Sequence, residues 1–148
     1  MKKITILCMF LIIVLKANAQ IEISNSQLVG IKWEKTEPLV KETTSTLLFT
    51  ETCYIDSTYD FTLEKSYTGS KEYYITNDLP SYLVFYKKYV GQERKGCYIV
   101  EYNSKMHEVD YYTVISFTGD ELILFHKAKP ETIPGIDVYI KYRRVKKE

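Results

Sequence analysis

The chain has 148 residues, and its 20 basic and 19 acidic residues give a formal charge of +1. This near balance excludes a strong electrostatic attraction to polyanions, so we expect no nucleic-acid partner. Tyrosine is abundant, with 14 residues. Large rings that carry a hydroxyl suit strands, where one side packs and the hydroxyl faces water.

The first nineteen residues have the three parts of an export signal. Basic Met1-Lys2-Lys3 precedes an apolar run, 4–15, and Ala17-Asn18-Ala19 fits a cleavage site. The run is shorter than the ~20 residues of a spanning helix. We therefore predict a signal peptide, 1–19. The mature chain begins at Gln20, is periplasmic or secreted, and has no membrane span.

The mature chain has the length of one domain. Loss of three signal lysines leaves 17 basic against 19 acidic residues, a formal charge of −2. We predict a flexible N-terminal segment, 20–27, and a single β-domain, 28–148. No linker or internal repeat divides it.

An alternating stretch, 46–64, indicates how this domain is built. Its odd positions, from Leu47 to Leu63, are mostly apolar, and its even positions are mostly Thr, Asp and Glu. A period of two predicts strands with one buried face. Asp56-Ser57-Thr58 predicts a turn that divides the stretch into two strands.

Similar segments follow, separated by turns rich in Gly, Asn and Pro, and none has helical spacing. The later strands are predicted at 71–76, 82–90, 97–102, 106–117, 121–127 and 137–145. A closed barrel and a two-sheet sandwich both fit this count, and successive hairpins favour the barrel. We predict an all-β fold, an antiparallel up-and-down meander closed into a barrel of about 8–10 strands.

Three features resemble the small bacterial secreted lipocalin-like domains, which belong to the calycin group. They are Leu28-Val29-Gly30 followed by Trp33, a basic last strand, and the segment 112–124, YTVISFTGDELIL. The spacing here is G-x-x-W, where lipocalins have G-x-W. The resemblance implies that Trp33 lies across one barrel end with an arginine packed on it, and strand parity selects Arg144. The alternative is that Arg144 belongs to a solvated basic tail.

The resemblance also implies a cup that holds a small apolar or amphipathic ligand. The residues predicted to line it are Phe49, Ile55, Tyr59, Phe61, Tyr111, Ile115 and His126. The same side chains would serve to fill a solid core. In that case, the domain is a structural or protein-interaction module with a Tyr-rich outer face that binds a protein partner.

Motifs for catalysis are scarce. His107 and His126 lack the spacing of metal ligands, and no nucleophile or phosphate-binding motif is present. Glu51 and Glu101, each among apolar neighbours, are a candidate carboxylate pair; the alternative places them at strand ends in water. We predict that the protein is not an enzyme and uses no cofactor and no metal.

The mature chain has two cysteines, Cys53 and Cys97. An oxidising compartment permits a disulfide between them, and we expect one on that ground. The alternative is two free thiols, because buried cysteine is also common.

Overall fold

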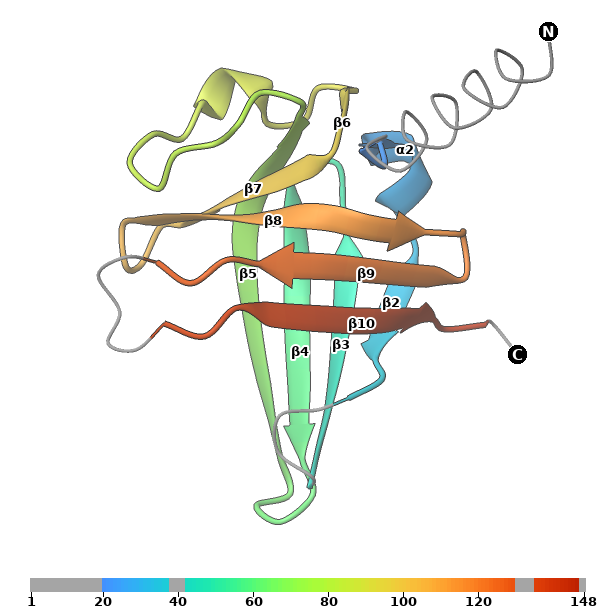
Figure 1. Cartoon of the computed structure of the whole chain (residues 1–148). Coiled ribbons are helices and arrows are strands. Elements are labelled where there is room, and N and C mark those ends of the chain that lie inside the picture. The colour runs from blue at the N-terminus through green and yellow to red at the C-terminus, as the bar shows by residue number, and fades with distance from the viewer. Residues whose placement is uncertain (1–19, 38–41, 130–134, 147–148) are drawn as a thin grey trace, which may run out of the picture.

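The computed structural model describes residues 20–37, 42–129 and 135–146, and the predicted signal peptide lies outside these ranges. Within them, eight strands form a barrel: β2 (Lys32–Lys35), β3 (Thr43–Phe49), β4 (Cys53–Asp60), β5 (Lys65–Thr76), β7 (Tyr98–Asn103), β8 (Glu108–Phe117), β9 (Glu121–His126) and β10 (Val138–Arg144). Each pairs antiparallel with the next, and β10 pairs with β2 (Figure 1). The predicted all-β, up-and-down barrel is confirmed.

The turn between β3 and β4 decides which side chains enter the barrel. The Thr50 hydroxyl accepts a hydrogen bond from the Cys53 amide at 3.1 Å and donates one to the Cys53 carbonyl at 2.7 Å. The chain therefore reverses here, and not at 56–58 as predicted. Phe49 lies opposite Tyr54 across this hairpin. Inward positions are consequently odd on β3 and even on β4.

The N-terminal segment is part of the fold. Instead of a loosely held 20–27, the structure has β1 (Ile23–Ser24), which pairs with β6 (Lys95–Gly96), followed by α2 (Asn25–Leu28). The side chains of Ile23 and Leu28 are buried in the main core cluster. The Asn25 amide donates to the Tyr73 hydroxyl at 3.4 Å. These contacts fix the segment against one end of the barrel.

The segment predicted as a strand at 82–90 is a loop that contains a short 3-10 helix, η1 (Lys87–Tyr89). Its rings pack on the outside of the barrel. Phe85 stacks on Tyr102, with ring centroids 5.2 Å apart, and also contacts Tyr74 at 5.2 Å. The apolar pattern that suggested a strand is therefore explained by side-chain packing on a sheet and not by strand pairing.

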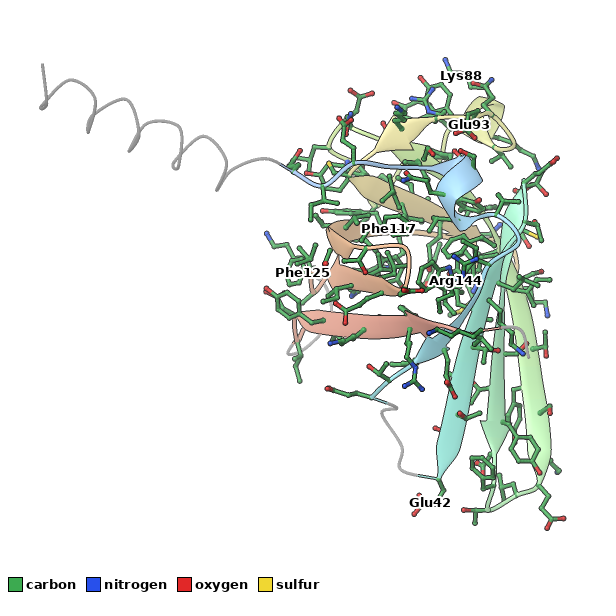
Figure 2. The ribbon with its side chains drawn as sticks, turned by 90° about the vertical axis from the view of Figure 1, so that its right-hand side faces the viewer. Glu42, Lys88, Glu93, Phe117, Phe125 and Arg144 are labelled. Atoms are coloured by element: carbon green, nitrogen blue, oxygen red, sulfur yellow. The ribbon has the colours of Figure 1, made fainter. Side chains whose placement is uncertain are left out.

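The barrel core is apolar at one end. It contains Trp33 and Phe49 together with aliphatic side chains from β3, β5, β7, β8 and β9. The β3–β4 and β4–β5 hairpin strands are longer than the barrel needs, and their far ends project from it (Figures 1 and 2). The projecting tip exposes Phe61 and Leu63.

Candidate functional site

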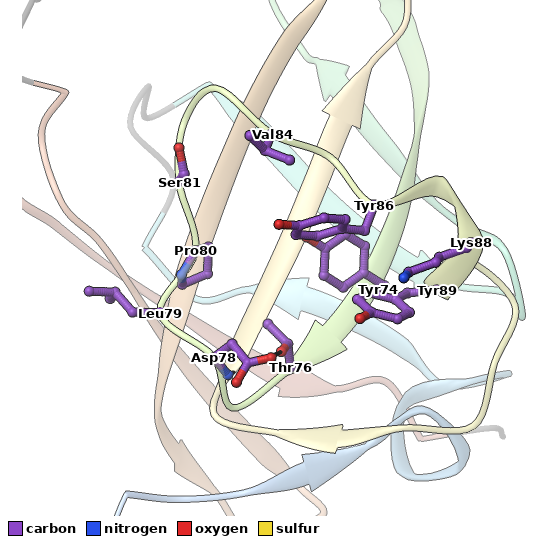
Figure 3. Close-up of a pocket in the computed structure, with 10 residues that line it drawn as sticks. All are labelled: Tyr74, Thr76, Asp78, Leu79, Pro80, Ser81, Val84, Tyr86, Lys88 and Tyr89. Atoms are coloured by element: carbon purple, nitrogen blue, oxygen red, sulfur yellow. Dashed lines mark hydrogen bonds between the residues drawn. The ribbon is translucent and has the colours of Figure 1, made fainter.

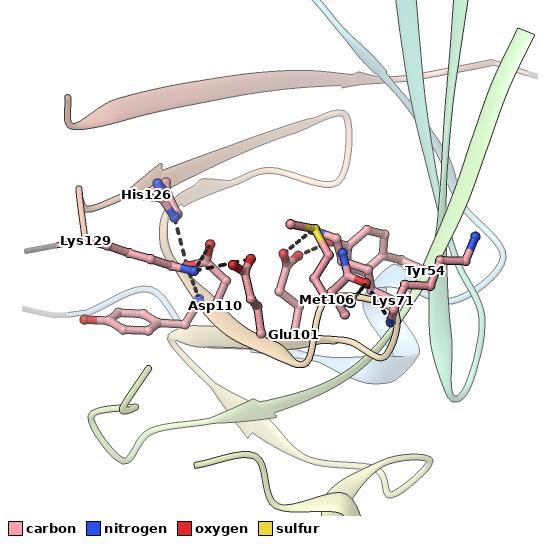
Figure 4. A network of polar contacts seen from close by, with 11 residues as sticks. Tyr54, Lys71, Glu101, Met106, Asp110, His126 and Lys129 are labelled. Carbon is pink, nitrogen blue, oxygen red and sulfur yellow. Dashed lines mark hydrogen bonds and ion pairs between the residues drawn. The ribbon is translucent and has the colours of Figure 1, made fainter. Parts of the chain in front are cut away.

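A buried carboxylate lies inside the barrel. Glu101 on β7 is 2% exposed. The Tyr54 hydroxyl donates to its Oε2, and the Lys71 ammonium forms an ion pair with its Oε1 (Figure 4). Burial of an unpaired carboxylate is very costly, and the cost falls when the charge is paired and hydrogen-bonded. These two contacts therefore explain how Glu101 is tolerated in the core.

Three tyrosines, Tyr54, Tyr112 and Tyr142, surround this charge. Burial raises the pKa of all three, and the negative charges of Glu101 and Asp56 raise it further. The hydroxyls therefore stay protonated at neutral pH and can donate hydrogen bonds. Tyr54 donates to Glu101, but the hydroxyls of Tyr112 and Tyr142 have no hydrogen-bond partner among the described residues. Both hydroxyls therefore make no hydrogen bond within the described part of the protein.

Four of these residues, Tyr54, Lys71, Tyr112 and Tyr142, border a cavity of about 80 Å³ inside the barrel, and Glu101 is not part of its lining. It is lined by Leu47, Phe49, Tyr54, Asp56, Lys71, Ile99, Tyr112, Leu124 and Tyr142. Pockets for small organic ligands usually offer ~300 Å³ or more, and a water molecule takes ~30 Å³ of liquid. This cavity therefore has room for only a few non-hydrogen atoms.

Asp56 gives this cavity a pH-dependent effect on stability. Burial raises the pKa of its carboxyl, although the ammonium groups of Lys71 and Lys35 act in the opposite direction. A carboxyl whose pKa is raised by folding contributes stability below its unfolded pKa of about 4, and that contribution is lost as the pH rises through the folded pKa. Asp56→Asn should therefore raise the free energy of unfolding at pH 7 and change it little at pH 3. Urea denaturation at both pH values measures this, and equal effects at the two would contradict it.

Two of the seven predicted lining residues point into the barrel. Phe49 is in the core cluster. His126 follows buried Leu124 at a spacing of two, and its Nε2 lies 2.8 Å from Asp110 Oδ1. Lys129 Nζ lies 3.5 Å from Asp110 Oδ2 (Figure 4). Among the described residues, no group of three or more His, Cys, Asp or Glu side chains is placed to hold a metal ion.

The other five predicted lining residues do not face the interior. They are Ile55, Tyr59, Phe61, Tyr111 and Ile115. The prediction for Ile55 is wrong because the position of the β3–β4 turn makes the even residues of β4 face inward. Tyr59 and Phe61 lie at the exposed tip of the projecting hairpin. β8 carries apolar side chains on both faces, so parity could not orient it. Tyr111 packs outside against Tyr82, with ring centroids 4.8 Å apart.

The predicted pair at the barrel end is brought together in register. Arg144 lies directly opposite Trp33 where β10 pairs with β2, the contact that closes the barrel. The indole is fully buried and contacts the Phe117 ring at 6.1 Å. The Arg144 side chain is exposed, so the structure pairs the two residues in register but does not show the guanidinium packed on the indole.

The expected disulfide is not formed. Cys53 and Cys97 are both free. Cys53 Sγ lies 3.3 Å from the Thr50 hydroxyl in the β3–β4 turn. Cys97 is buried, with its Sγ 3.2 Å from the Gln20 side-chain oxygen. Each thiol therefore has its own local partner, and the alternative of two free thiols describes the structure.

A larger cleft lies on the outside of the barrel, between β5 and the loop 77–92 (Figure 3). Its volume is about 460 Å³, within the usual range for small-molecule sites. It is lined by Tyr74, Thr76, Asp78, Leu79, Pro80, Ser81, Val84, Tyr86, Lys88 and Tyr89. We call it the tyrosine cleft.

Aromatic contacts hold this cleft in shape. Tyr74, buried on the outer face of β5, has its ring centroid 5.4 Å from that of Tyr89 and 6.4 Å from that of Tyr86. The Arg94 guanidinium lies 3.8 Å from the Tyr89 ring centroid, and its Nε donates to the Ile75 carbonyl at 2.9 Å. Tilted and edge-on ring contacts, a cation-π contact and a hydrogen bond thus attach the cleft wall to the barrel.

The cleft combines apolar and polar groups. Tyr86 is 50% exposed, and Leu79 and Val84 are also exposed beside it. Asp78 and Lys88 supply one charge of each sign. Exposed apolar side chains gathered on one loop, next to a few polar groups, are typical of ligand-binding surfaces. The cleft can therefore hold a molecule with an apolar body and a polar or charged group.

Sequence reasoning did not identify the tyrosine cleft or the partners of Glu101. Glu101 was singled out as a candidate, but its proposed partner Glu51 is exposed in the β3–β4 turn. Lys71 and Tyr54 approach Glu101 from strands β5 and β4, and only the barrel register shows that. The aromatic residues of 82–90 predict a strand, but in the structure this segment is a loop whose rings pack on the outside of the barrel.

In the ranges 20–37, 42–129 and 135–146, no helix is long and apolar enough to cross a bilayer. Comparisons of the chain with protein-family models, curated proteins and solved structures find no match.

Proposed function

We propose that this protein is an exported, non-catalytic binding module that holds a small amphipathic ligand in the tyrosine cleft. One observation carries the proposal. The cavity inside the barrel has about 80 Å³, whereas the cleft on its outer face offers about 460 Å³. Export rests on the signal-like segment 1–19, and the non-catalytic role rests on the scarcity of catalytic motifs.

The chemistry of the cleft defines the ligand class. The rings of Tyr74, Tyr86 and Tyr89 offer flat apolar surface at low conformational cost, because each has only two side-chain torsions. The Lys88 ammonium lies near two of these rings, 5.1 Å from the Tyr89 centroid and 6.0 Å from that of Tyr86. A planar apolar molecule that bears an anionic group fits this arrangement.

A protein partner is the second candidate, and a specific observation favours it. Leu83 is 86% exposed and Leu79 is 76% exposed, both on the loop that forms the cleft. Large apolar side chains in such positions are typical of contact surfaces. A partner segment that occupies the cleft would cover Leu79, which lines it, and Leu83 lies on the same loop.

The test replaces one cleft ring and measures binding of 8-anilinonaphthalene-1-sulfonate, a planar probe with an anionic group. Tyr86→Ala should weaken binding about tenfold, or about 1.4 kcal/mol, because it removes the most exposed ring of the cleft. Tyr67→Ala is the matched control, since Tyr67 is 52% exposed but lies at the β5 end of the projecting hairpin. Fluorescence titration of the wild type and both variants gives the affinities.

Two outcomes of these titrations would contradict the proposal. A probe that binds the wild type and Tyr86→Ala equally well is not in the cleft. If Tyr67→Ala weakens binding as much as Tyr86→Ala does, the probe recognises exposed tyrosine in general, and the proposal is wrong.

A further inference from the structure

The side chain of Lys71 lines the barrel cavity and carries an ammonium group. Lys71 extends from β5, its side chain is 31% exposed, and its ammonium is paired with buried Glu101. The same ammonium lies 5.9 Å from the ring centroid of Tyr54. A carboxylate beside an aromatic face is the combination that recognises alkylammonium ions.

The remaining walls of the cavity suit the two parts of such an ion. Asp56 is the carboxylate that lines the cavity itself, and Glu101 lies behind the Lys71 ammonium. The hydroxyls of Tyr112 and Tyr142 have no hydrogen-bond partner among the described residues. An ammonium group offers hydrogen bonds to all of these oxygens. Leu47, Phe49, Ile99 and Leu124 form the apolar part of the lining and would contact a short alkyl chain.

We propose that this cavity binds a short primary alkylammonium ion, which replaces the Lys71 ammonium beside Glu101. Lys71 can leave, because its side chain is flexible and already reaches solvent. This site is separate from the tyrosine cleft, and it rests on different residues.

The cavity volume sets the size of the ligand. About 80 Å³ is the space of roughly three water molecules, so an ion with about three or four non-hydrogen atoms fits. Propylammonium meets this limit, and hexylammonium exceeds it. Because affinity is bounded by ligand size, and because Lys71 competes for Glu101, we expect a dissociation constant of roughly 1 mM.

The experiment titrates the isotope-labelled wild-type protein with propylammonium chloride and follows backbone amide signals by NMR. Saturable shifts are expected at Ile99, Glu101 and Tyr112. Sodium chloride at the same ionic strength should not reproduce them, which separates an alkylammonium site from a general cation effect. Hexylammonium should bind at least about threefold more weakly than propylammonium, since the cavity cannot hold its chain.

Variants connect the binding to the named groups. Tyr142→Phe removes a hydroxyl that makes no hydrogen bond to another described residue, so the fold should survive and propylammonium affinity should fall about tenfold. Lys71→Ala removes the internal competitor, so propylammonium should bind about tenfold more tightly and raise the melting temperature of this variant. The matched control is Lys87→Ala, which breaks the exposed ion pair with Glu72 and should behave as the wild type.

If Lys71→Ala fails to fold, the wild type and Tyr142→Phe still test the proposal. Saturable shifts in the wild type that weaken in Tyr142→Phe support the site. The proposal is overturned by an absence of saturable shifts, by equal shifts with sodium chloride, or by equal affinity in the wild type and Tyr142→Phe.

Discussion

Replacement of Trp33 by alanine should lower the free energy of unfolding by about 3–5 kcal/mol, the range for loss of a buried large aromatic. The indole is fully buried, contacts Phe117, and lies where the first and last strands of the barrel pair. The cavity left by the ring would therefore open at the closure of the sheet. Chemical denaturation, followed by circular dichroism, measures the loss.

Trp33→Phe is the matched control. The indole Nε1 has no hydrogen-bond partner among the described residues, so its replacement removes a buried, unpaired donor. Such a donor costs about 1–3 kcal/mol, which offsets part of the lost packing. We expect Trp33→Phe to cost no more than about 2 kcal/mol. A loss below about 1 kcal/mol for Trp33→Ala would show instead that the indole is not part of the core.

Gly96→Ala should also be strongly destabilising, by about 3 kcal/mol or more. A Cβ atom at Gly96 would overlap the backbone carbonyl of Thr76 on β5, and backbone cannot move aside as a flexible side chain can. Gly96 also pairs with Ile23, so the N-terminal segment should come away from the barrel. Unfolding free energy and hydrogen exchange at residues 23–28 give the two readouts.

Gly69→Ala provides the comparison for this prediction. Gly69 is also in a strand, β5 of the barrel, and a Cβ atom there meets nothing within 4 Å. Gly69→Ala should change the free energy of unfolding by less than about 1 kcal/mol. Similar losses for the two substitutions would mean that a general property of glycine in strands, and not the close approach of Thr76, controls the effect at Gly96.

The fold could be predicted from the sequence because its signals are local. A period of two in Thr46 to Phe49 marks a strand with one buried face, and Gly119 marks the β8–β9 turn, where it adopts a φ of +86°. Successive hairpins then favour a meander, and its ends must pair to remove exposed edges. Family resemblance and strand parity predict that Arg144 packs on Trp33; the register places the two residues opposite each other, but the Arg144 side chain is exposed.

The lumen lining could not be predicted in the same way, because it depends on where each turn falls. One displaced turn, at Thr50 instead of Asp56, exchanges the inward and outward faces of β4. Tyr54 is thereby buried in the barrel and Asp56, although exposed, lines its cavity, whereas Ile55 is on the opposite face of β4.

The tyrosine cleft could not be predicted from the sequence for a different reason. Aromatic residues that cover the outside of a sheet have the composition of a strand, and residues 82–90 were interpreted as one. Only the packing of Phe85 on Tyr102 and of Tyr82 on Tyr111 shows that this segment is a loop on the barrel surface. Long-range contacts of this kind leave no periodic signal in the sequence.

The most direct test of the binding proposal locates the bound probe. NMR titration of the labelled protein with 8-anilinonaphthalene-1-sulfonate should give its largest amide shifts at Thr76, Val84, Tyr86 and Tyr89, which line the tyrosine cleft. The lumen residues Leu47, Ile99 and Leu124 should remain nearly unchanged. Largest shifts at those three residues, with none in the cleft, would show that the ligand enters the barrel and would contradict the proposed function.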